Sequence, residues 1–104
     1  MDKTSLLKAI RSALETIYGG RLRGVLLYGS EARGEARADS DIDVLVLLDR
    51  VGNYGEELRR CLDALYPLSL ELERRISPKP VDALQYESVD CPLYRQVHCE
   101  GIAA

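Results

Sequence analysis

Two short groups of residues in this sequence have the types and spacing that phosphate and metal chemistry requires. Gly29-Ser30 ends an apolar run, and Asp41-x-Asp43 follows after ten intervening residues. A glycine lets the backbone approach a ligand closely, and the N–H groups of a beginning helical turn form an anion site together with a serine hydroxyl. Alternation along a strand turns Asp41 and Asp43 to one face, roughly 7 Å apart, where both can hold one divalent ion or share a pair of ions. Since Mg²⁺ binds one or two carboxylates together with substrate phosphates, the combination predicts metal-assisted chemistry on a nucleoside triphosphate.

Each group is common by itself, because Gly-Ser often forms a turn and Asp-x-Asp often ends a strand in solvent. Their joint occurrence at this spacing is expected by chance in roughly one chain of this length per thousand at average residue usage. The two carboxylates also open the strand expected over residues 42–48, whose remaining residues are mostly apolar. A solvent-exposed strand end therefore explains them poorly.

The elements that must position these residues can be read from hydrophobic periodicity. A helix is predicted over residues 5–18, with Thr4 or Ser5 as its N-cap and Gly19-Gly20 as its end. Residues 24–28 form a short apolar run that predicts a buried strand, and residues 30–33 have room for one helical turn before the second strand.

The second half of the chain predicts further helices and one weaker strand. A helix is expected from about residue 54 to the low 70s, kinked or split at Pro67. Residues 76–81 resemble a third strand, at best an edge strand because its two prolines cannot donate to a ladder. Short helices are expected over residues 83–86 and 92–100. The order predicts an α/β (α+β) fold, a small mixed sheet flanked by helices.

Composition limits the classes of protein that fit. The chain has 104 residues, 46% of them apolar, and a formal net charge of −3, which predicts one domain over residues 1–104. No apolar run approaches the length of a membrane span, and the mild acidity disfavours direct nucleic-acid binding through bulk charge. The three cysteines form no metal-binding or disulfide pattern, so a reducing cytoplasm is the expected compartment.

The residues around both groups resemble a known family. Leu27-Tyr28-Gly29-Ser30-Glu31-Ala32-Arg33-Gly34, followed by Ser40-Asp41-Ile42-Asp43-Val44-Leu45-Val46, is similar to the signature of the DNA polymerase β-like nucleotidyltransferases. Within that superfamily it looks like the minimal nucleotidyltransferases, which include the antitoxins of toxin–antitoxin pairs with a HEPN-domain toxin. The resemblance extends to the C-terminal Pro92-Leu93-Tyr94-Arg95 and Glu100-Gly101-Ile102 segments, nearly the whole chain.

The resemblance implies roles for individual residues. Gly29 and Ser30 would hold the β- and γ-phosphates of ATP, and Asp41 and Asp43 would bind two catalytic Mg²⁺ ions. Asp82 is the candidate for the third carboxylate that normally completes such a site, although it could equally be the N-cap of the helix that follows. Arg33 is a candidate for nucleotide binding, with a structural pairing to a nearby acid as the alternative.

The resemblance also implies an activity and a partner. The expected reaction is transfer of AMP from ATP to a hydroxyl, that of a tyrosine on a HEPN-type toxin, which would make the protein an antitoxin. The chain has no room for an acceptor-binding domain, so we expect a protein partner to supply that surface, in a homo- or hetero-oligomer. One alternative is a catalytically silent module that neutralises its partner by binding. The other is an enzyme of the antibiotic-modifying kind.

Overall fold

The computed structural model describes residues 2–104, and these form a four-stranded sheet with helices on both faces. Strands run in the order β3-β2-β1-β4, from β3 (Ile76–Asp82) through β2 (Ile42–Leu48) and β1 (Leu22–Tyr28) to β4 (Ile102–Ala103). β1 is antiparallel to both of its neighbours, whereas β2 and β3 are parallel. The predicted small mixed sheet is thus confirmed.

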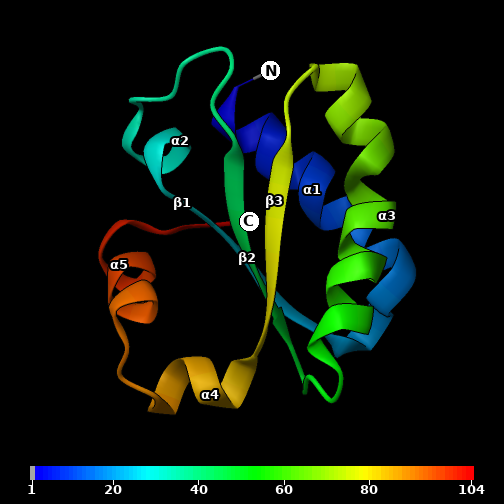
Figure 1. Cartoon of the computed structure of the whole chain (residues 1–104), viewed down its shortest axis with the longest axis vertical. Helices are drawn as coiled ribbons and strands as arrows, with labels where there is room; N and C mark the ends of the chain where they lie inside the picture. Colours follow the sequence, from blue (N-terminus) through cyan, green and yellow to red (C-terminus); the bar gives the residue numbers. More distant parts are fainter. Residues whose placement is uncertain (1) are drawn as a thin grey trace.

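Two long helices cover one face of the sheet. Figure 1 shows α1 (Lys3–Tyr18) and α3 (Tyr54–Leu72) side by side on that face, and the two helices contact one another. Their buried side chains form the main core with the inward residues of the sheet. Within α3, Cys61 and Leu65 are buried, whereas Leu62 and Tyr66, which follow them directly in the sequence, are largely exposed.

The opposite face carries a smaller core and the shorter helices α4 (Ala83–Ser88) and α5 (Pro92–Glu100). Tyr28, Leu45 and Val81 from three strands meet Tyr86 and Val97 from these helices. Because β2 is central and covered on both sides, its buried residues include successive positions, which explains why it reads as an apolar run rather than an alternating one.

Most element boundaries agree with the sequence, and the differences have local causes. α1 begins earlier than predicted, because the side chain of Asp2 rather than Thr4 or Ser5 caps it, accepting a hydrogen bond from the Ser5 N–H at 2.8 Å. α3 is not split at Pro67, which lies on the exposed side of the helix, where water can bind the carbonyl that loses its N–H partner. The two-residue β4 is too short to have a period and was not predicted.

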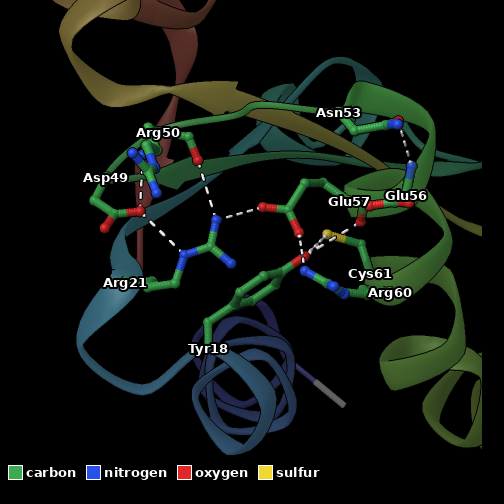
Figure 2. A network of polar contacts seen from close by, with 9 residues as sticks. All are labelled: Tyr18, Arg21, Asp49, Arg50, Asn53, Glu56, Glu57, Arg60 and Cys61. Carbon is green, nitrogen blue, oxygen red and sulfur yellow. Dashed lines mark hydrogen bonds and ion pairs between the residues drawn. The ribbon is translucent and has the colours of Figure 1, made fainter.

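An ion-pair network around the buried Glu57 joins four elements at one end of the sheet (Figure 2). Glu57 of α3 is 3% exposed, and its carboxylate pairs with Arg21, which also binds Asp49, and with Arg60 at 2.8 Å. The Tyr18 hydroxyl donates to the backbone carbonyl of Glu57 at 3.2 Å. The network ties α1, the 3-10 turn Gly19–Arg21 and the end of β2 to the start of α3.

Candidate functional site

The loop after β1 has the backbone conformation that only glycine adopts readily. Gly29 has φ 76° and ψ −156°, and the short helix α2 (Ser30–Arg33) begins directly after it. The Arg33 N–H donates to the Gly29 carbonyl at 3.1 Å, and Gly34 ends the turn in the left-handed region. The predicted helical turn over residues 30–33 is therefore confirmed.

The structure brings this loop onto the carboxylate of Asp43. Tyr28, the last residue of β1, pairs directly with Asp43 near the start of β2. A Cβ atom placed on Gly29 would lie 2.7 Å from Asp43 Oδ2, closer than real Cβ contacts. The absence of a side chain at residue 29 is thus what allows backbone and carboxylate to share this space. Two groups that lie fourteen residues apart along the chain, residues 29 and 43, form one site.

Asp41 and Asp43 form a pair of like charges at the start of β2. Asp41 is exposed and Asp43 half-buried. Burial raises the pKa of Asp43, the Asp41 charge raises it further, and the Lys79 charge opposes both effects. Asp41 and Asp43 lie close enough for one charge to disfavour ionisation of the other carboxylate, and such a pair beside a glycine loop fits a divalent cation, which binds oxygen ligands. The donor set therefore suits Mg²⁺, with Asp41 and Asp43 as the residues that would hold it.

Arg74 anchors the segment that connects α2 to β2. Arg74, just after α3, pairs with Glu31 at 2.9 Å and donates twice to the Ser40 carbonyl, at 3.0 and 3.1 Å. The Ser40 hydroxyl accepts from the Arg37 N–H at 3.0 Å. Glu31 and Arg74 look like solvated surface charges in the sequence, but here they hold the segment that leads into Asp41.

Arg33 points to a glutamate at the end of α5. Its guanidinium pairs with Glu100 at 2.9 Å and with Glu35 at 3.0 Å. The Glu100 carboxylate also accepts from the Gly29 N–H at 2.9 Å and from Gln96 at 2.6 Å, and these bonds, that of Arg33 foremost, lower its pKa. Arg33 has the acid partner that the sequence left open, and its role toward a nucleotide stays a prediction. Glu100 fastens α5 to the glycine loop.

Asp82 does not reach this site, so the prediction that it is a third catalytic and metal-binding carboxylate is wrong. In the parallel pairing Asp43 lies opposite Ser77, whereas Asp82 lies opposite Leu48, five residues and about 17 Å further along the strand. Its carboxylate caps α4, accepting from the N–H of Leu84 at 2.9 Å. Figure 1 shows α2 at the top of the view and α4 at the bottom.

Sequence reasoning missed the β3 residues that do flank Asp43. Ser77 lies directly opposite it and Lys79 one step further on the same face. Only the register between β2 and β3 shows this, because the family pattern directs attention to an acid and neither residue is one. Within residues 2–104, no cluster of three or more His, Cys, Asp or Glu residues is arranged to hold a metal ion.

Comparisons with known proteins agree with this geometry. The family model described as Polymerase beta, Nucleotidyltransferase matches residues 10–103. The chain is 38% identical over 77 residues to the protein adenylyltransferase MntA of Thermococcus cleftensis, covering 72% of this chain and 76% of that protein. It is 39% identical over 49 residues to the protein MJ0604 of Methanocaldococcus jannaschii, described as a protein adenylyltransferase, and the match spans 49% of that relative.

Solved structures share the fold. A minimal nucleotidyltransferase superimposes with a TM-score of 0.57 at 30% identity, over 98% of this chain and 95% of that one. A toxin–antitoxin structure with AMP-PNP superimposes with a TM-score of 0.65 at 19% identity, over 99% of this chain and 72% of that one. Within residues 2–104 no helix is both long and apolar enough to cross a membrane. The protein combines a glycine-serine loop with an Asp-x-Asp pair, and it matches the family model over nearly its whole length. It therefore belongs to the polymerase β nucleotidyltransferase family.

Proposed function

We propose that this protein transfers AMP from ATP to a tyrosine hydroxyl of a HEPN-domain toxin, and that it acts in this way as an antitoxin. The observation that carries the proposal is the contact between the two groups: Gly29 lies so close to Asp43 that a Cβ atom would meet its carboxylate at 2.7 Å. A nucleotide bound at the loop would therefore have its phosphates beside the carboxylates that attract a cation. The relatives described as protein adenylyltransferases support the choice of AMP and of a protein acceptor.

The chain's own residues supply binding and orientation. Gly29 leaves space above Asp43, and the start of α2 presents the Ser30 N–H and hydroxyl to a phosphate. Asp41 and Asp43 would hold Mg²⁺, which would withdraw electron density from the phosphoryl oxygens. The acceptor oxygen then forms a bond to the α-phosphorus, the bond to the β-phosphate oxygen breaks, and pyrophosphate leaves with the electron pair. The hydroxyl proton passes to solvent.

A protein acceptor is also supported by the surface of α3. Leu62, Tyr66 and Leu70 are 45%, 60% and 60% exposed, and they border an open groove of about 660 Å³ that reaches Ile76 of β3. Apolar side chains gathered on an otherwise charged surface are typical of a protein-binding face. The fold is shared with solved toxin–antitoxin structures, which agrees with such a partner.

The proposal is tested by incubating the protein with labelled ATP, Mg²⁺ and a co-expressed HEPN partner. Label on the partner tyrosine, lost in Asp41→Asn and Asp43→Asn proteins, is the expected result. Asp39→Asn, which removes an exposed acid from the preceding loop, is the matched control.

A silent binding module is the second candidate, and the absence of a third carboxylate beside Asp43 in residues 2–104 favours it. On this hypothesis the protein neutralises its partner by covering it. Inhibition of the toxin at equimolar amounts by an Asp41→Asn/Asp43→Asn protein, with no AMP on the partner, would support the silent module over the enzyme.

A further inference from the structure

Lys79 is the charged residue that β3 presents next to the carboxylate pair. Residues alternate along the strand, and Val81 packs with Tyr28 and Leu45 in the smaller core. Lys79 therefore lies on the same face of the sheet as Val81. Tyr28 and Asp43, which lie opposite one another in β1 and β2, are on that face too. In register Lys79 lies opposite Leu45, one diagonal step from Asp43, at about 8 Å between Cα atoms. A lysine side chain spans such a distance readily.

The backbone around Lys79 is fixed by the sequence. Pro78 and Pro80 flank it, and each locks its own φ. A residue before proline is in addition restricted to extended conformations. The direction in which Lys79 leaves the strand is therefore set before any ligand binds, so that little backbone entropy is lost when its ammonium engages one.

The charge of Lys79 has no ion-pair partner among the residues that the structure describes. It forms none of the eight ion pairs found among residues 2–104. It is half-buried. A cation thus stands on the strand where the family pattern leads one to expect a third carboxylate.

We propose that Lys79 is a further active-site residue, whose ammonium donates a hydrogen bond to an oxygen of the nucleotide α-phosphate. The inference rests on the proposed function. During transfer the ammonium keeps its protons and stabilises the negative charge that grows on the α-phosphoryl oxygens.

The first test measures cation binding without nucleotide or partner. Mn²⁺, a spectroscopic substitute for Mg²⁺, is titrated into the wild-type protein and into Lys79→Met and Lys79→Arg proteins, with binding followed by electron paramagnetic resonance. Removal of the neighbouring charge should tighten Mn²⁺ binding by about three- to tenfold. The arginine variant should behave as wild type. Lys8→Met, a lysine lost from the exposed side of α1, is the control and should not change binding.

The second test measures affinity for the ATP analogue AMP-PNP in EDTA by calorimetry. Lys79→Met should weaken binding by about five- to tenfold and Lys79→Arg should restore most of it. Equal Mn²⁺ and AMP-PNP affinities in wild type and Lys79→Met would overturn the proposal. A protein that shows these binding changes but transfers no AMP contradicts the proposed function and leaves the position of Lys79 established.

Discussion

Replacing Gly29 by alanine should strain the backbone and displace Asp43 at the same time. The backbone at residue 29 has φ 76° and ψ −156°, a region that residues with a side chain rarely adopt, and the strain there costs about 1–3 kcal/mol. The added methyl group would also lie 2.7 Å from Asp43 Oδ2, so the carboxylate must move. Off-rotamer displacement of one side chain adds about 0.5–1.5 kcal/mol. Gly29→Ala should therefore lower the free energy of unfolding by roughly 2–4 kcal/mol.

A double-mutant cycle separates the two contributions. In an Asp43→Ala background the steric contact is gone, so Gly29→Ala should cost only the backbone strain, about 1–3 kcal/mol. The coupling energy between residues 29 and 43 should be about 0.5–1.5 kcal/mol. Urea denaturation of the four proteins in EDTA, followed by circular dichroism, gives both numbers. Additive effects, with no coupling between the two positions, would refute the placement of Gly29 on the carboxylate. A cost under 0.5 kcal/mol for Gly29→Ala would refute the strained backbone.

Three further predictions concern the supports of the site and the fold. Glu100→Ala should lower the midpoint of thermal unfolding, because it removes the acceptor that the Gly29 N–H and Arg33 share, and Glu100→Gln, which can still accept hydrogen bonds, should lower it less; equal midpoints would contradict the role of Glu100 in holding the loop. Arg21→Met should lower the free energy of unfolding by about 1–3 kcal/mol in urea denaturation, because Glu57 is 3% exposed and keeps only Arg60 as a charged partner. The Arg21→Met/Glu57→Met protein should recover part of that loss, because no buried charge is left without its partner. Equal stabilities of the single and double variants would contradict this role of Arg21. Because the pKa of Asp43 is raised in the folded state, the folded protein binds its proton at higher pH than the unfolded chain does. The metal-free protein should therefore lose stability as the pH rises through that pKa. Asp43→Asn should be more stable than wild type at pH 7 in EDTA, as measured by thermal unfolding. Lower stability of the variant would show that the folded protein does not disfavour the ionised carboxylate.

Much of the fold could be predicted because its signals are local. The apolar run of β2, the helical period of α1 and the proline at the start of α5 each depend on a few consecutive residues. β3 could be predicted as an edge strand from its two prolines. The pairing of strands that lie far apart in the sequence could not be predicted. The two residues of β4 are a strand only because they lie against Leu26 and Leu27.

The same contrast between local signals and long-range pairing applies to the candidate site. Gly29, Ser30, Asp41 and Asp43 are found from the sequence because their spacing is itself the signal. Asp82 was misplaced because its two possible roles have the same local pattern, an acid after a strand and before a helix. Only the parallel register, which pairs it with Leu48, decides between them.

The charged residues around the site are harder still to predict. Glu100, Arg74 and Lys79 reach it from α5, from the turn after α3 and from β3. In the sequence alone, each of these residues looks like an ordinary surface charge. Gly29 and Glu31, the partners of Glu100 and Arg74, and the carboxylates near Lys79 are brought to them by tertiary packing, which has no period that a sequence could show.

The central claim is that the loop at Gly29 and the carboxylates of Asp41 and Asp43 act together on a nucleoside triphosphate. The most direct measurement is transfer of α-labelled AMP from ATP to the co-expressed HEPN partner, with wild type, Asp41→Asn, Asp43→Asn and Asp82→Asn compared at equal concentration. The account predicts Mg²⁺-dependent labelling by wild type and by Asp82→Asn, and a loss of at least a hundredfold in the other two variants. Labelling that survives in Asp41→Asn and Asp43→Asn, or that disappears in Asp82→Asn alone, would contradict it.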